Sequence, residues 1–62
     1  MVTLRLVDPD QYTVPDGLRT VPAGDEAQAR ADLKHLAAEH AARWAGFGYR
    51  ADAYRILTDP TA

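Results

Sequence analysis

Residues 25–45 are predicted to form one long amphipathic helix, and this feature constrains the fold of the chain more than any other. Asp25, followed three positions later by Gln28, is typical of a capping box at a helix start. Gly46 is expected to take the left-handed conformation that ends a helix, and Phe47 is expected to pack back on the last turn. A helix with an apolar side needs a second layer to cover that side.

The predicted helix has three faces when its residues are placed at 100° intervals. The apolar face is expected to lie against the core, and a polar flank lies beside it. The third face carries small side chains, which either allow close helix approach in a symmetric dimer or reflect the high helix propensity of alanine. The apolar face holds Ala29, Leu33, Leu36, Ala37, His40 and Trp44, the polar flank Gln28, Asp32, His35, Glu39 and Arg43, and the alanine face Ala27, Ala31, Ala38 and Ala42.

Short β-strands are predicted on both sides of the helix. Residues 2–7 alternate between apolar and polar side chains, which is typical of a strand with one buried face. Proline, aspartate and glycine then predict turns that divide the next segment into two short strands, 12–14 and 18–21. After the helix, residues 49–57 fit a strand better than a second helix, although the helical alternative stays open. The predicted turns or breaks lie at 8–11, 15–17 and 22–24.

The sequence therefore predicts an α+β fold: a small antiparallel sheet of three or four short strands with one long helix packed across one face, in the order β-β-(β)-α-β. The chain, residues 1–62, is expected to be a single domain because it is too short for two cores. Residues 60–62 are expected to form a frayed tail. The expected core consists of Leu4, Leu6, Val14, Leu18, Tyr54 and Ile56 from the strands, with Tyr12 facing the same side, and Leu33, Leu36, Ala37 and Trp44 from the helix.

Composition narrows the class of protein. The formal net charge is −2 and the chain has no cysteine, which argues against a general polyanion binder and excludes disulfides and thiolate metal sites. No apolar run approaches the length of a membrane span and no signal sequence is visible, so we expect a cytoplasmic protein with no membrane contact. Arginine far outnumbers lysine and aspartate outnumbers glutamate, which suggests a GC-rich bacterium or one of its phages as the source. The small core makes self-association a further expectation.

No combination of side chains predicts catalysis or a bound cofactor. Serine and cysteine are absent from the sequence, and the threonines lie in predicted strands or turns. Asp32, His35 and Glu39 share one helix flank at spacings that suit a cation. Mixed charges on an exposed helix more often pair with one another, so we expect no metal there. His40 is expected to be a hydrogen-bonded core histidine, with a pH-sensitive pocket as the alternative.

The residues from Trp44 to Arg50 are the main candidate for a binding site. Trp44, Phe47 and Tyr49 are interleaved with glycines and followed by Arg50. Flat aromatic side chains beside a cation suit both a protein partner and stacked nucleic-acid bases. The plain alternative is that this run only ends the helix and supplies core aromatics.

The open face of the predicted sheet is the second candidate surface, with Arg5, Arg19 and Arg55 expected on it. From these two surfaces we expect a small non-enzymatic protein-binding module with an accessory or regulatory role and a protein partner. Two alternatives remain. One is a nucleic-acid-binding module that uses the arginines and aromatic rings. The other is a structural subunit of a larger assembly.

Overall fold

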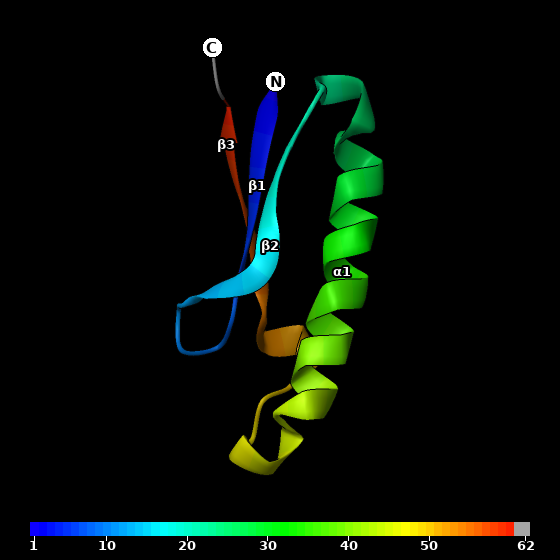
Figure 1. Cartoon of the computed structure of the whole chain (residues 1–62). Helices are drawn as coiled ribbons and strands as arrows, with labels where there is room; N and C mark the ends of the chain where they lie inside the picture. The colour runs from blue at the N-terminus through cyan, green and yellow to red at the C-terminus, as the bar shows by residue number, and fades with distance from the viewer. Residues whose placement is uncertain (61–62) are drawn as a thin grey trace.

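The computed structural model describes residues 1–60 and places three strands and one long helix along the chain. The elements are β1 (Val2–Val7), β2 (Thr13–Val21), α1 (Glu26–Arg43) and β3 (Arg55–Pro60). The strands form an antiparallel sheet in the order β2-β1-β3, and α1 lies across one face of it (Figure 1). The structure confirms the predicted α+β class, with the long helix covering one side of the sheet.

The core lies between α1 and the helix-facing side of the sheet. Leu4 and Leu6 of β1 and Leu33 of α1 are fully buried there, as the period-two and helical patterns predicted. The remaining members of the cluster are Val14, Ala29 and Ala37, and Val2, Val21, Leu36, Tyr54 and Ile56 pack partly buried against it.

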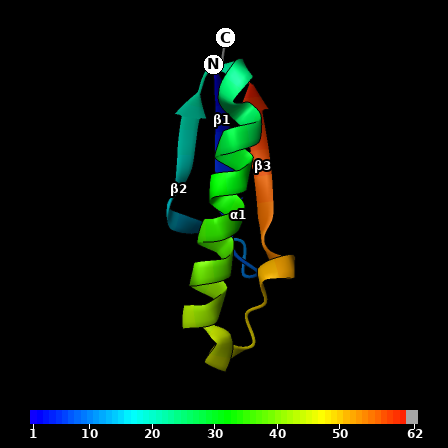
Figure 2. The same cartoon turned by 90° about the vertical axis from the view of Figure 1, so that its right-hand side faces the viewer.

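The buried side of α1 is narrower than the predicted apolar face, because its buried residues form a single row at four-residue intervals, while Leu36 and His40 beside it are only half-buried. Trp44, predicted in the core, is 40% exposed. Figure 2 shows the reason, since the last turns of α1 extend past the ends of the strands and have no sheet to cover. The four buried residues of α1 are Ala29, Leu33, Ala37 and Ala41, whereas Ala27, Ala31, Ala38 and Ala42 of the alanine face are exposed.

β2 is one nine-residue strand, where the sequence predicted two strands separated by a turn at 15–17. Its register against β1 is interrupted, so that Leu6 alone lies opposite residues 14–17. Asp16 takes a positive φ of 64°, and a Cβ on Gly17 would lie 2.8 Å from the carbonyl oxygen of Val14. The Pro-Asp-Gly sequence therefore makes a bulge inside a strand, because both flanking segments remain paired with the same neighbour.

The bulge changes which side chains of β2 face the helix. Residues directly opposite one another in an antiparallel pair share a face of the sheet. Leu18 lies opposite Arg5, and Arg19 lies opposite Leu4. Leu18 is therefore on the open face and 59% exposed, and Arg19 is on the helix side. The predicted orientation of Leu18 and Arg19 was wrong, because β2 has three more residues than β1 across the bulge, and an odd number of extra residues reverses the side chains that follow.

Three other expectations need correction. Tyr12, predicted to face the core, lies before β2 and is 72% exposed. The strand predicted at 49–57 begins only at Arg55, after a 3-10 turn, η3 (Ala51–Ala53). From there the strand prediction is confirmed, and β3 pairs with β1 without interruption. The predicted tail began at Pro60, which instead ends β3, and residues 61–62 lie outside the described part of the chain.

Both ends of α1 differ in detail from the prediction. The chain enters the helix through a 3-10 turn, η1 (Ala23–Asp25), which leaves Asp25 at φ −101° and ψ 6°. A capping side chain needs an extended backbone, so Asp25 caps nothing and Gln28 instead donates to the Oδ1 atom of Asp32. At the other end, Gly46 lies within the 3-10 turn η2 (Ala45–Phe47), and Gly48 takes the left-handed conformation with φ 83°. The capping box and the role given to Gly46 were therefore wrong.

Candidate functional site

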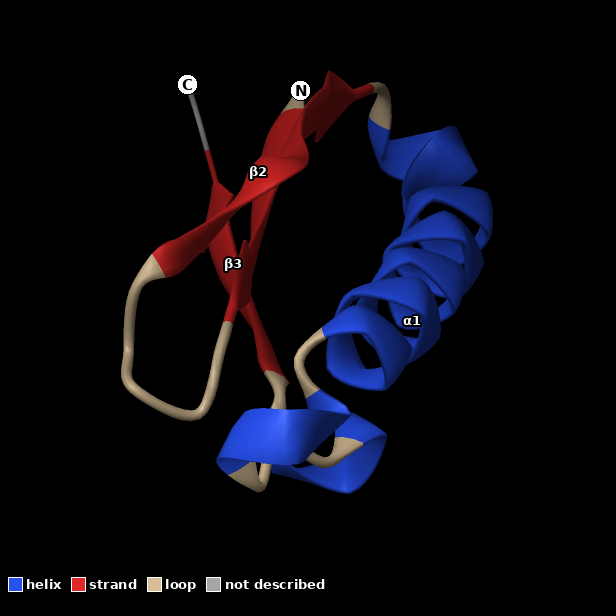
Figure 3. Cartoon of the chain, turned by 60° about the horizontal axis from the view of Figure 1, so that its bottom comes forward, coloured by secondary structure: helices blue, strands red, loops and turns tan. Residues whose placement is uncertain are grey.

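Five aromatic or imidazole rings gather where α1 ends, and we call this group the ring cluster. Figure 3 shows that the short turns η2 and η3 also lie at this end of the molecule. Neighbouring ring centroids are 5.3 Å apart for Trp44 and Phe47 and 5.6 Å apart for His40 and Tyr54. The cluster consists of His40, Trp44, Phe47, Tyr49 and Tyr54. The sequence predicted the middle three members, and the fold adds His40 and Tyr54 to them.

The inner members of the ring cluster are fixed by hydrogen bonds. The Nδ1 atom of His40 shares a hydrogen bond with the hydroxyl of Tyr54, and both side chains are half-buried. The hydroxyl of Tyr49 donates to the Oδ2 atom of Asp10, in the loop between β1 and β2. Asp8 orders that loop, since its Oδ1 atom accepts from the backbone N–H groups of residues 10 and 12 at 3.0 and 2.9 Å. The base of the cluster is therefore held by α1, β3 and the loop together.

The same contacts keep both inner phenols protonated. The hydrogen bond to Asp10, partial burial and the negative charges of Asp10 and Asp8 raise the pKa of Tyr49 to about 12. Burial, followed by repulsion from Asp8, raises the pKa of Tyr54. Because both pKa values are shifted further from neutrality, neither hydroxyl is suited to act as a general base near pH 7.

The outer members of the ring cluster face solvent. Trp44 is 40% exposed and Phe47 is 74% exposed, and their rings contact each other at a tilt of 46°. The predicted packing of Phe47 back on the helix is met only by this contact, which leaves most of its surface in water. Two adjacent exposed aromatic side chains are a feature of protein-binding surfaces.

A groove runs from Trp44 along the helix to the bulge in β2, and we call it the β2-side groove. It has a volume of about 390 Å³ and is lined by apolar side chains together with charges of both signs. Trp44 lines the groove and also belongs to the ring cluster, so the groove and the exposed rings share this side chain. The lining residues are Val14, Pro15, Leu36, His40 and Trp44 with the charged Asp16, Glu39 and Arg43.

Arg50, the fourth residue predicted in the aromatic segment, forms an ion pair with Asp52. Its Nη2 atom lies 3.3 Å from Oδ2 of Asp52, and both side chains are more than 70% exposed. An ion pair this exposed contributes little to stability. Arg50 thus lies near the rings in sequence, but its ion pair is with a residue of η3.

The three arginines predicted on the open sheet face do not stay together. Arg5 and Arg55 do lie on that face as diagonal neighbours, because Arg5 is opposite Leu57. Arg19 lies on the helix side and donates from Nη1 to the carbonyl oxygens of Asp16 and Leu18, across the bulge. The Nε atom of Arg5 is shielded from solvent without an acceptor among the described residues.

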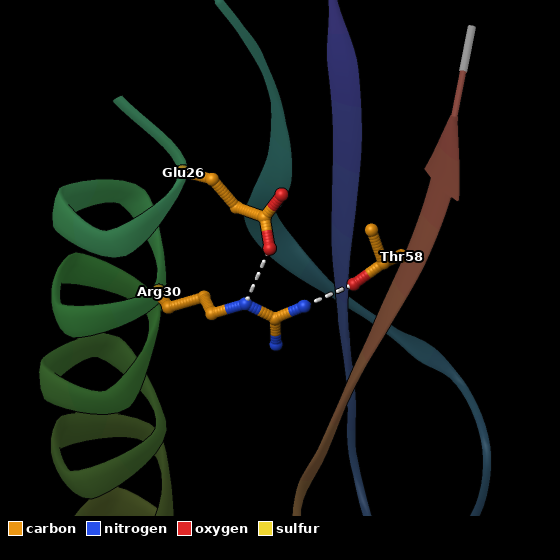
Figure 4. A network of polar contacts seen from close by, with 3 residues as sticks. All are labelled: Glu26, Arg30 and Thr58. Atoms are coloured by element: carbon orange, nitrogen blue, oxygen red, sulfur yellow. Dashed lines mark hydrogen bonds and ion pairs between the residues drawn. The ribbon is translucent and has the colours of Figure 1, made fainter. Parts of the chain in front are cut away.

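A second groove, the β3-side groove, lies on the other side of α1. It has a volume of about 530 Å³, and Arg30, one of its lining residues, makes polar contacts that the sequence analysis did not predict. Arg30 binds Oε2 of Glu26 through Nε at 3.0 Å and donates from Nη2 to Oγ1 of Thr58, which ties α1 to β3 (Figure 4). The four-residue spacing of Glu26 and Arg30 could have predicted the ion pair between them, because residues one helical turn apart are neighbours on a helix surface. The groove is lined by Leu6, Arg30, Lys34, Ala37, Ala51, Asp52, Tyr54 and Ile56.

Across residues 1–60, the side chains of histidine, aspartate and glutamate form no group of three or more that could hold a metal ion. Within the same residues, none of the helices combines the length and the apolar character needed to cross a bilayer. Comparison of the chain with protein-family models, with curated proteins and with solved structures gave no match.

Proposed function

We propose that this chain is a small non-enzymatic protein-binding module with an accessory or regulatory role. It holds a segment of a protein partner along the β2-side groove and against Trp44 and Phe47. The observation that carries the proposal is the exposed, mutually packed pair of rings, one of which, Trp44, also lines a groove.

The arrangement suits binding for an energetic reason. Trp44 contacts His40 and Tyr49 as well as Phe47, so its ring is already restrained before a partner arrives. A restrained side chain loses less conformational entropy on binding, and tryptophan is among the residues that contribute most to interfaces. The groove offers apolar side chains such as Leu36, and its Glu39 and Arg43 can bind main-chain groups. The expected ligand is an extended segment that inserts an apolar side chain between α1 and the bulge.

The test begins with a photo-crosslinking residue in place of Phe47, used in extract of the source cell to identify the partner. Titration calorimetry with the purified partner then compares variants. Trp44→Ala is expected to weaken binding by about 30-fold, the loss typical of an interface hot spot. Leu18→Ala is the matched control, because Leu18 is also an exposed apolar residue but lies on the open sheet face. Equal affinity for Trp44→Ala and the parent chain, or an equal loss for Leu18→Ala, would remove the proposal.

Nucleic-acid binding is the second candidate, and one observation favours it: Arg5 and Arg55 are neighbours on the open sheet face. Arg19 and Arg50 contribute to other parts of the molecule, so fewer cations converge than the sequence suggested. A steep loss of DNA or RNA retention with added salt, and a further loss in Arg5→Ala, would support this candidate. A role as a structural subunit would instead appear as incorporation of the chain into a larger purified assembly.

A further inference from the structure

The two edges of the sheet are not equivalent. The edge at β2 carries Pro15 and the bulge, which are devices that protect a strand edge from pairing with another chain. The edge at β3 has neither, since its six residues pair with β1 in unbroken register and its only proline is the last residue. Figure 2 shows β3 at the margin of the sheet with no element beyond it along the strand. Its outward backbone N–H and C=O groups are therefore open to a further strand.

The open-face side chains of β3 form a self-complementary charge pattern. Arg55, Leu57 and Asp59 lie on that face at alternate positions, since their partners in β1 are the alternate residues 7, 5 and 3. Arg55 and Asp59 are exposed, and neither has an ion-pair partner among residues 1–60. When two copies of β3 run antiparallel with Leu57 opposite Leu57, the cation of each strand lies opposite the anion of the other.

We propose that β3 pairs antiparallel with β3 of a second copy of this chain, about a twofold axis at Leu57. Each Arg55 then lies opposite Asp59 of the other copy, and Leu57 lies opposite its own counterpart. The two three-stranded sheets become one sheet of six strands, and the contact is the same from either side, as in most symmetric dimers. Opposite charges directly across an antiparallel pair are stabilising, and like charges in the same place are destabilising.

Charge complementarity also selects the register. An axis at Ile56 would place Arg55 opposite Leu57, and an axis at Thr58 would place Leu57 opposite Asp59. Only the axis at Leu57 gives both charged residues an opposite charge. Register is strongly determined where shifting a strand would lose such pairs.

The helix side of the molecule leaves room for this contact. The twofold axis runs perpendicular to the sheet, so both copies of α1 lie on the same face of the six-stranded sheet. The β3-side groove separates α1 from the strand, and Arg30 holds β3 in place from the helix side by its hydrogen bond to Thr58 (Figure 4). The two grooves would adjoin across the new strand pair. The surface proposed for the protein partner lies on the opposite side of α1, so the dimer does not depend on the proposed function.

The test uses the full chain and measures its mass in solution by sedimentation and light scattering. The parent chain is expected to form dimers at about 100 µM, whereas Arg55→Asp and Asp59→Arg each place like charges opposite one another. Each single variant is expected to raise the dimer dissociation constant by about tenfold or more. The double variant Arg55→Asp/Asp59→Arg restores both pairs and is expected to dimerise as the parent does.

Mixing the two single variants gives a sharper result. One copy then has acidic residues at both positions and the other has basic residues at both, so an equimolar mixture is expected to form a heterodimer more tightly than either variant forms its own dimer. This recovery also shows that both variants are folded. Leu18→Asp is the control for packing through the open sheet face, because Leu18 is on β2 and far from the β3 edge. It is expected to leave the dimer intact.

Four outcomes would overturn the proposal. They are a monomeric parent chain, a dimer indifferent to the charge reversals, single variants whose mixture stays monomeric, and a dimer lost in Leu18→Asp. Hydrogen exchange provides a separate measurement, since the outward amides of β3 should become protected as the concentration of the chain rises. Protection that arises only when another protein is added would assign the edge to a foreign strand and would equally reject self-pairing.

Discussion

His40 and Tyr54 are joined by a hydrogen bond between the Nδ1 atom of the imidazole and the phenol hydroxyl, across 14 positions of sequence. His40 lies in the last turn of α1, and Tyr54 immediately precedes β3. Their rings also meet edge to face, with an interplanar angle of 77°. The contact thus connects the last turn of α1 to the start of β3 within the ring cluster, where Tyr54 packs against the apolar core.

Removal of the Tyr54 hydroxyl should therefore destabilise the fold. Tyr54→Phe leaves the ring in place but deprives His40 of its partner, and the free energy of unfolding is expected to fall by about 1 kcal/mol. Urea denaturation monitored by circular dichroism measures the change. Tyr12→Phe is the control, because Tyr12 is 72% exposed, and it should be neutral. Equal stabilities of Tyr54→Phe and the parent would show that the hydrogen bond contributes nothing.

Tyr49 predicts a dependence of stability on alkaline pH. Its pKa is raised to about 12 in the fold, above the ordinary value of 10.0, first by the hydrogen bond to Asp10. The stabilisation linked to this shift is fully present below pH 10 and is lost as the pH rises toward 12, because the unfolded chain releases its proton first. Asp10→Asn removes the charged acceptor and should lower the pKa of Tyr49 toward 10. Ultraviolet titration of tyrosinate checks this, with Asp52→Asn expected to leave the pKa of Tyr49 unchanged.

Leu33 should be the most sensitive position of the core. It is fully buried at the centre of α1, so Leu33→Ala is expected to cost about 2–5 kcal/mol. A domain of this size has a total stability of about 3–9 kcal/mol, so much of the variant should be unfolded at room temperature. Leu18→Ala, which changes an exposed leucine, should shift stability by no more than about 0.5 kcal/mol. Thermal denaturation compares the two, and similar melting temperatures would contradict the assigned burial.

Gly17 should tolerate no side chain. A Cβ there would lie 2.8 Å from the carbonyl oxygen of Val14 and 3.0 Å from Cβ of Leu6, so Gly17→Ala must move the bulge and is expected to cost about 1–3 kcal/mol. Gly24→Ala is the matched control, because nothing lies within 4 Å of the added atom. It should be neutral or stabilise the fold by up to about 1 kcal/mol. The same denaturation experiment separates the two, and a neutral Gly17→Ala would show that the bulge is pliable.

Local periodicity was enough to predict the helix, the first strand and the layer between them. Leu4, Leu6 and Leu33 follow spacings that depend only on backbone geometry, and all three are buried. The bulge could not be predicted in the same way. Proline, aspartate and glycine favour a turn and a bulge for the same conformational reasons, and pairing with β1 decided between them. Which face holds Leu18 and Arg19 depended on that decision.

The candidate site was predicted in composition but not in geometry. Trp44 and Phe47 were identified as aromatic residues near a helix end, yet their exposure arises because α1 extends beyond the sheet. How far α1 extends beyond the sheet depends on the relative lengths of the helix and the strands, which a local sequence pattern does not predict. The bond between His40 and Tyr54 and the contact of Arg30 with Thr58 likewise join residues distant in sequence.

Val2 lies directly opposite Pro60 in the sheet, so the start of β1 and the end of β3 lie at the same end of the molecule (Figure 1). A brief glycine linker could therefore circularise the backbone without disturbing the ladder between the strands. Circularisation would keep the joined residues together in the unfolded chain and so lower the conformational entropy of the denatured ensemble. The circular protein would therefore melt at a higher temperature than its linear parent.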